Sequence, residues 1–114
     1  MTIDEIKRRN ADRGHHFFDR STMRFFRSRV GKWTVRGEDD RVYFITSEQF
    51  DEQSDRRFTI RAMETDGAVN TVGEFQAFAD LRTAKRAAVK IARSARSATS
   101  AAGSATDSAQ EVSE

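Results

Sequence analysis

The apolar residues of the chain recur with a helical spacing near both ends and with a strand spacing between them. At the start, Thr2 and Glu5 have the spacing of a capping box, in which each side chain bonds a free backbone amide at a helix N-terminus. We therefore expect a helix over residues 3–12. Ile3 and Ile6 are its only clear apolar pair, which predicts that this helix is weakly anchored.

A second short helix is predicted before the strands begin. Met23, Phe26 and Val30 follow one another at spacings of three and four, so they share one face of a helix. The polar residues Asp19 and Ser21 are both suitable N-caps, and the helix is expected to begin after one of them.

Beyond residue 31 the period changes to two, which is typical of half-buried strands. Residues 32–36 and 57–63 alternate in this way, and the Asp66-Gly67 pair predicts a hairpin whose returning strand is residues 68–72. Residues 41–46 are apolar or β-branched on both faces. This pattern predicts a central strand, or a strand covered by helices on one face and by a partner on the other, so a homodimer through it stays open.

The strongest helical pattern follows Asp80, a residue type that favours helix N-caps. Apolar residues, mostly alanines, fall on one arc of this helix, and basic residues fall on the opposite arc. The apolar arc consists of Leu81, Ala84, Ala87, Ala88, Ile91, Ala92 and Ala95, and the basic arc of Arg82, Lys85, Arg86, Lys90, Arg93 and Arg96. Such an alanine-rich face can pack closely against a sheet.

These elements predict an α+β fold with a three- to four-stranded antiparallel sheet, a C-terminal amphipathic helix packed on one face, and one or two short N-terminal helices. We expect one compact domain over residues 1–97, in which residues 1–14 form a loosely attached helix. Residues 98–114 are rich in Ala and Ser and carry acids but no base, which predicts a disordered acidic tail. The chain has no cysteine, so its stability depends on packing.

Charged residues are sorted along the chain. Residues 20–36 contain six bases and no acid, and residues 82–96 again contain bases but no acid. Residues 38–55 contain seven acids and one base. Residues 1–97 together carry twenty bases and fifteen acids, and such a surplus favours a polyanion or an acidic protein as partner.

The basic segments are the first candidate binding site. If they adjoin in space, their side chains can neutralise the phosphates of a nucleic acid or of a ribonucleoprotein. The candidate residues are Arg24, Arg27, Lys32, Arg82, Lys85, Arg86, Lys90 and Arg93. Phe25 is a candidate for stacking on a base, whereas Phe17, Phe18 and Phe26 are expected in the core. A surface helix also needs a polar outer face, so the basic arc alone does not establish binding.

The acidic block is the alternative site. Asp39, Asp40, Asp51 and Asp55 can mimic a nucleic-acid backbone and bind a basic groove of a host or defence protein. Exposed aromatic side chains can serve the same role of inhibitor or adaptor. The local density of these acids in turn-like sequence also fits a solvated, charged loop.

The sequence predicts a non-enzymatic protein. It has no glycine-rich phosphate loop, serine nucleophile motif or dinucleotide fingerprint. His15 and His16 are adjacent, an arrangement that rarely chelates one ion, and we expect neither a metal nor a cofactor. No apolar run has the length of a membrane span, and the charged N-terminus lacks the apolar core of a signal peptide. A cytoplasmic protein without membrane contact is the resulting expectation.

Residues 81–92, LRTAKRAAVKIA, resemble the last helix of double-stranded RNA-binding domains. Arg82 and Lys85 match two of the three basic positions in the KKxAK pattern of that helix, and a leucine replaces its first lysine. The order helix, three strands, helix is also similar. The chain departs from that family in the extra strand around Trp33 and in the acidic residues 47–55, which stand where the family has a loop that enters the minor groove.

A second resemblance covers residues 15–92. The strings HHFFDRSTMRFFRSRV, VYFITSE, RRFTIR and TVGEFQAF are similar to small uncharacterised proteins carried by bacteriophages and plasmids of high-GC hosts. The resemblance implies a compact accessory protein of a mobile element that acts by binding. It implies no catalytic residues.

Overall fold

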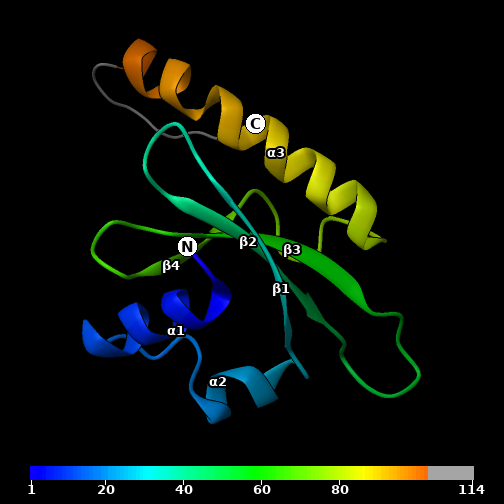
Figure 1. Ribbon diagram of the computed structural model, residues 1–114. Helices are drawn as coiled ribbons and strands as arrows, with labels where there is room; N and C mark the ends of the chain where they lie inside the picture. The colour runs from blue at the N-terminus through cyan, green and yellow to red at the C-terminus, as the bar shows by residue number, and fades with distance from the viewer. Residues whose placement is uncertain (103–114) are drawn as a thin grey trace.

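Helices and strands follow one another in the order that the sequence pattern predicts. The computed structural model describes the backbone of residues 1–102 and the side chains of residues 1–94. The elements are α1 (Ile3–Asp12), α2 (Arg20–Phe25), β1 (Arg29–Arg36), β2 (Val42–Glu48), β3 (Arg57–Met63), β4 (Val69–Val72) and α3 (Leu81–Ala102). The four strands form one antiparallel sheet in the order β1-β2-β3-β4, which confirms the predicted α+β fold (Figure 1).

The sheet lies between two helical layers (Figure 1). α3 crosses one face, where Ala88 and Ala92 pack against Tyr43, Ile60 and Ala62. The alanines have no long side chain to hold the helix away from the strands, so their stripe is fully buried. The predicted docking face of the C-terminal helix is therefore the observed one.

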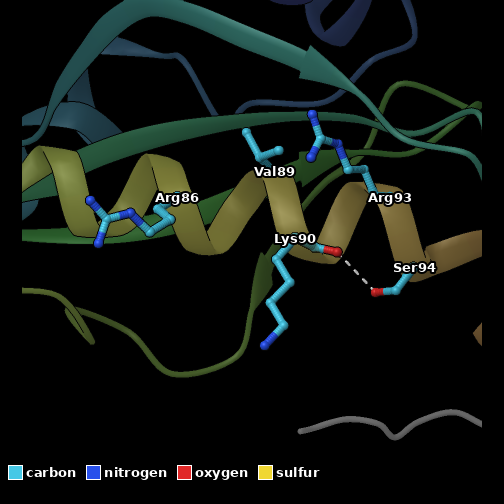
Figure 2. A pocket seen from close by; sticks show the side chains of 5 residues that line it. All are labelled: Arg86, Val89, Lys90, Arg93 and Ser94. Carbon is cyan, nitrogen blue, oxygen red and sulfur yellow. Dashed lines mark hydrogen bonds between the residues drawn. The ribbon is translucent and has the colours of Figure 1, made fainter.

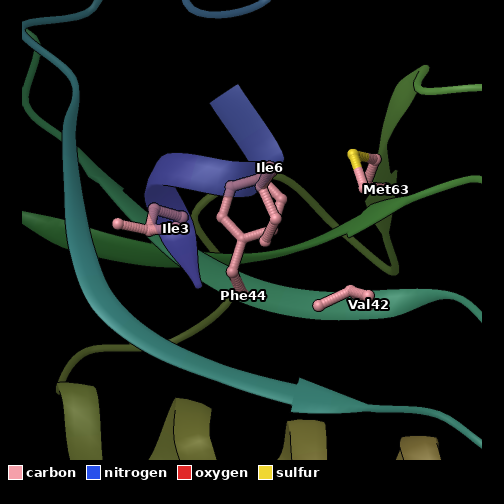
Figure 3. Close-up of a cluster of buried hydrophobic side chains, with 5 residues drawn as sticks. All are labelled: Ile3, Ile6, Val42, Phe44 and Met63. Carbon is pink, nitrogen blue, oxygen red and sulfur yellow. The ribbon is translucent and has the colours of Figure 1, made fainter. Parts of the chain in front are cut away.

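α1 and the segment that follows it cover the opposite face of the sheet. Ile3 and Ile6 point from α1 toward Phe44, and Val42 and Met63 complete this second apolar cluster (Figure 3). Successive residues of β2 point to opposite faces, so one strand supplies side chains to both clusters. The double burial explains why residues 41–46 are apolar without alternation.

α1 is anchored more firmly than its single apolar pair predicted. Asn10 is buried and bonds two other segments: its Nδ2 donates to the Gly67 carbonyl oxygen at 2.8 Å, and its Oδ1 accepts from the Phe17 amide at 3.2 Å. A Cβ on Gly67 would lie 3.1 Å from the Arg9 carbonyl oxygen, so the helix approaches this hairpin turn closely. The expectation of a loosely attached helix rested on apolar contacts alone and stays a prediction, to which the buried amide of Asn10 adds a polar contact.

β2 is the centre of the sheet, and it pairs with β1 on one side and with β3 on the other. Every residue of Val42–Glu48 is buried. This strand therefore has neither a free edge nor an uncovered face, and the homodimer stays a prediction without an exposed surface on this strand. Its apolar character on both faces is explained by the helical layers of the same chain.

Several boundaries differ from those predicted. α2 ends at Phe25, because Arg27 adopts a φ of 50° and turns the chain into β1, so Val30 lies in that strand instead of on the helix. Residues 98–102, expected to belong to a tail, are helical, because α3 continues to Ala102. Residues 103–114, where the rest of that expectation falls, lie outside the described residues.

Candidate nucleic-acid interface

β1 departs from regular pairing with β2 at a bulge. Val30 lies opposite Thr46 and Thr34 lies opposite Phe44, so four steps along β1 match two steps along β2. Residues 31–33 accommodate the excess and arch away from the neighbouring strand. An ideal Cβ on Gly31 would meet no heavy atom within 4 Å, so the start of the bulge has open space beside it.

The bulge forms one wall of a cavity of about 480 Å³, and the first turns of α3 form the facing wall. Trp33, Ile45, Phe58 and Leu81 supply an apolar and partly aromatic lining. Three bases also line the cavity, namely Arg29, Lys32 and Lys85, whereas no described acidic residue does. The cavity therefore combines an apolar interior with a positive rim.

Lys85 connects the two basic segments of the chain. It lies on α3, and its Nζ is 5.8 Å from the centroid of the Trp33 ring in the β1 bulge. An ammonium group over an indole face is held by the electron-rich ring, and the bond is worth on the order of 0.5–2 kcal/mol. This contact fixes the start of α3 beside the bulge and holds a positive charge at the cavity.

The remaining bases of α3 point outward. Arg82, Arg86, Lys90 and Arg93 are exposed, and their spacing of four, four and three residues places them along one side of the helix. Arg86, Lys90 and Arg93 line an open pocket on this helix, and Figure 2 shows Lys90 and Arg93 extending from the helix in different directions. Among the side chains that the structure describes, none of these bases forms an ion pair with a carboxylate.

The helix begins at a defined cap. The Oδ1 atom of Asp80 accepts a hydrogen bond from the Thr83 amide at 2.8 Å, which satisfies one of the free amides of the first turn. This bond lowers the pKa of Asp80, and the positive charges of Arg82 and Arg86 lower it further. The cap thus positions the basic side of α3 relative to the cavity.

The structure brings together some of the sequence-predicted bases and separates others. Lys32 and Lys85 meet at the cavity, and the other α3 bases extend from it along the helix. Arg24 and Arg27 do not line it. Arg27 lies instead beside the loop between β2 and β3, where its Nη1 is 4.0 Å from a Glu52 carboxylate oxygen. The proposed site therefore loses these two residues.

Arg29 is a lining residue that the sequence analysis did not select. The second helix was predicted to include Val30, so Arg29 was assigned to that helix and not to the strand. The bulge itself left one signal in the sequence, because Gly31 is a residue type that strand bulges favour.

The acidic block is not one surface. Asp39 and Asp40 lie in the turn at one end of β2, and Asp51 and Asp55 lie in the loop at its other end, so the seven residues of this strand separate them by roughly 20 Å. Asp39 is nearly buried, accepts from Arg41 Nε at 2.7 Å, and also accepts from the Tyr43 hydroxyl at 3.0 Å. Burial raises the pKa of Tyr43 and keeps this hydroxyl protonated as a donor.

Two of the other three candidate acids, Asp40 and Asp51, are also engaged within the chain. Asp40 pairs with Arg36 at 3.2 Å, although both side chains are exposed. Asp51 organises its loop by accepting bonds from the Ser54 hydroxyl and from the Gln53 amide, and these bonds lower its pKa. No internal partner is described for Asp55.

The role of Glu48 is not evident from the sequence. The acidic sequence around it fits a solvated, charged loop, yet Glu48 ends β2, has no exposed surface, and accepts from Thr59 Oγ1 at 2.7 Å. The Arg61 guanidinium donates to it at 2.9 Å and also lies 5.2 Å from the Phe17 ring centroid. This cluster fills the sheet face next to the Ile3 and Ile6 cluster and is structural.

Four phenylalanines form an aromatic cluster at the edge of the same face. Phe26 is its centre, with ring centroids of Phe25, Phe50 and Phe75 at 4.5, 6.2 and 5.1 Å. Phe25 and Phe50 are 77% and 69% exposed, so these large apolar side chains face water. Phe25 is therefore outside the core, as expected, and its stacking on a base stays a prediction.

The fold and this site define a small α+β protein in which a basic helix, whose described bases form no ion pair, lies beside an aromatic cavity. The chain belongs to DUF7447, a family of unknown function that it matches over residues 2–89. Comparisons with curated proteins and with solved structures found no match.

Two kinds of site have no counterpart in the described part of the chain. No helix there has both the length and the apolar character needed to cross a membrane. No three side chains among the described His, Asp and Glu residues gather in an arrangement that suits a metal ion.

Proposed function

We propose that this protein is a non-enzymatic binding protein that engages nucleic acid, alone or within a ribonucleoprotein, through the basic side of α3 and the β1 bulge. One observation supports this most: the exposed, described bases of α3 form no ion pair with a described carboxylate, while Arg36, Arg41 and Arg61, in or beside the sheet, do. Cations that are already free of protein partners can bind phosphates without first losing an internal bond.

The spacing of these bases suits an extended polyanion. Arg82 and Arg93 are separated by about 16 Å along the helix axis, with Arg86 and Lys90 between them on the same side. A rigid helix holds the four charges in register, so a strand of phosphates that follows the helix meets them in turn. The resemblance of residues 15–92 to accessory proteins of phages and plasmids agrees with a binding role in a mobile element.

The test measures binding of labelled short single-stranded RNA and DNA by fluorescence anisotropy over a range of salt concentrations. Replacing Arg86, Lys90 and Arg93 by glutamate is expected to lower affinity by about 100-fold or more at low salt, and to reduce the salt slope by about 0.7 for each lost phosphate contact. The matched control reverses Lys7, Arg8 and Arg20, which are also exposed but belong to α1 and α2.

An unchanged affinity in the α3 variant, or an equal loss in the control, would contradict a defined basic site. Absence of any binding by the unmodified protein would remove the proposed function altogether. The comparison needs no assumption about sequence preference, because phosphate contacts act on any strand.

A second candidate function, binding to a host protein, is favoured by the aromatic cluster of Phe25, Phe26, Phe50 and Phe75. Two strongly exposed phenylalanines, Phe25 and Phe50, that both contact the Phe26 ring are unusual on a surface that has no apolar partner. Their neighbours include Arg27 and Glu52, so an apolar patch with a charged rim is available to a protein partner.

Replacement of Phe25 and Phe50 by serine separates this candidate from the first. We expect a nuclease-treated pull-down from host extract to retain a specific protein with the unmodified chain and to lose it with this variant. The control variant Leu81→Ser removes an exposed apolar residue from the other site. Only nuclease-sensitive material in the pull-down would argue against the second candidate, and purified partner must reproduce the loss.

A further inference from the structure

We propose that the cavity beneath the β1 bulge holds one unpaired base of a single strand, while the phosphates beside that base bind Lys32, Lys85 and Arg29. This inference rests on the proposed function and specifies its ligand. It also distinguishes a single strand from a duplex, whose bases are not free to enter a cavity.

The lining of the cavity fits a planar aromatic ring better than a simple anion. Trp33 and Phe58 present aromatic surface, and Ile45 and Leu81 add aliphatic surface. A base that stacks on an aromatic side chain gains about 1–3 kcal/mol, and this gain does not depend strongly on base identity. The volume of about 480 Å³ lies within the range of small-molecule sites, so a base has room to enter.

The charges at the rim fit the phosphates that flank such a base. Lys32 stands on the bulge and Lys85 faces it from α3, so the entrance carries bases on two sides. Lys85 rests over the Trp33 ring, and its flexible stem lets the ammonium turn from the ring to a phosphate when a base takes its place. The phosphates that follow continue toward Arg86, Lys90 and Arg93.

Ser47 supplies a polar group at the lining. Its Oγ accepts a hydrogen bond from Arg56 Nη1 at 2.9 Å, and the residue as a whole is only 6% exposed. No acceptor for the Ser47 hydroxyl proton is found among the described residues, so this buried group keeps one donor for a ligand. A carbonyl oxygen on the edge of a pyrimidine or a guanine is the matching acceptor.

Trp33 is the only tryptophan of the chain, so its emission reports directly on this cavity. The experiment titrates the unmodified protein with short oligouridylate, with a duplex of equal length, with uridine monophosphate and with inorganic polyphosphate. We expect the single strand to quench Trp33 emission saturably, at the concentrations where anisotropy shows binding. The duplex and polyphosphate should bind with little quenching.

Several outcomes overturn the inference. Binding of the single strand without any change in Trp33 emission would leave the basic face intact and exclude the cavity. Equal quenching by polyphosphate would indicate that only charge is recognised. Quenching by the mononucleotide with the affinity of the strand would indicate a free-nucleotide site. If no nucleic acid binds at all, the proposed function fails together with the inference.

Two variants test the same contacts without relying on emission. Trp33→Leu is expected to lower single-strand affinity by about 5- to 150-fold with an unchanged salt slope, because stacking and not charge is removed. Phe25→Leu is the matched control and should have no effect. A loss in Phe25→Leu with none in Trp33→Leu would move the stacking site to the aromatic cluster.

The second variant, Ser47→Ala, removes the unused donor while the Ser47 carbonyl oxygen still accepts from Arg56 at 2.9 Å. A loss of several-fold in single-strand affinity, with unchanged duplex affinity, is the expected result. An equal effect on both ligands would contradict a contact to an unpaired base. Because this change is small, it keeps the inference testable if Trp33→Leu does not fold.

Discussion

Arg41 and Arg61, in or beside the sheet, form ion pairs within the chain, whereas the described bases on the outer side of α3 carry the same charge and form none. Arg61 is largely buried and bonds Glu48, and Arg41 bonds Asp39 and lies 3.2 Å from Glu64. The bases on the outer side of α3 are exposed and have no described acidic partner. The charge pattern of a sequence therefore does not distinguish structural cations from ligand-binding ones. The distinction depends on which residues each cation contacts in the folded chain.

The largest effect is expected where a structural pair is broken. Glu48→Ala leaves the Arg61 guanidinium and the Thr59 hydroxyl without their acceptor inside the protein, and such a loss costs about 3–5 kcal/mol. Urea denaturation followed by circular dichroism measures it. Replacing both partners, as in Glu48→Leu with Arg61→Met, should restore most of the stability. A loss below about 1 kcal/mol in the single variant would show that this pair is not structural.

An intermediate effect is expected from crowding the other pair. A Cβ on Gly37 would lie 2.5 Å from Asp39 Oδ1 and 2.6 Å from Tyr43 Cε1, and neither atom can move without disturbing the bonds among Asp39, Arg41 and Tyr43. Gly37→Ala should therefore destabilise the protein by about 1–3 kcal/mol in the same assay. Gly31→Ala is the control, because open space surrounds that position. Equal effects of the two variants would contradict the tight turn.

A smaller and pH-dependent effect is expected at the cap of α3. The folded-state pKa of Asp80 is lowered, so its ionised form stabilises the fold above the unfolded pKa of about 3.9, and this contribution is lost as the pH falls through the folded pKa. Asp80→Ala should therefore be less stable than the unmodified protein at neutral pH and approach it in acid. Thermal unfolding across this pH range measures the difference. A constant difference down to the lowest pH would exclude the ionised cap.

The smallest effect on stability is expected on the basic side of α3. Replacing Arg86, Lys90 and Arg93 by alanine removes no described ion pair, so the free energy of unfolding should change by less than about 0.5 kcal/mol. The same denaturation assay measures it. A large loss would mean that these bases are structural, and the contrast between the two sets of cations would fail.

Periodicity predicted the helices and strands of this fold well where residues close in sequence determine the pattern. β3 (Arg57–Met63) has the predicted bounds because its alternation is regular and a hairpin signal follows it. α1 (Ile3–Asp12) also begins and ends as predicted, since Thr2 and Glu5 form both bonds of the capping box. Local patterns of this kind need no knowledge of distant segments.

The sequence did not reveal features that depend on distant partners. Glu48 appears as a loop acid until Arg61 and Thr59, from the next strand, surround it. Asn10 appears as a surface amide until the Gly67 carbonyl is beside it. The cavity is of the same kind, because it requires the bulge of β1 and the start of α3 to face each other. Both basic segments were identified from the sequence, but only some residues of each line the cavity.

The β1 bulge also has a consequence for how separate copies of the protein behave in solution. The strand order leaves β1 as one edge of the sheet, with backbone amides and carbonyls that a foreign strand can join. The arch over residues 31–33 interrupts the flat run that such a strand needs, and Lys32 places a charge on it. The bulge thus prevents polymerisation through edge-to-edge strand pairing between copies of the protein. A regular β1 would leave this edge open to such pairing.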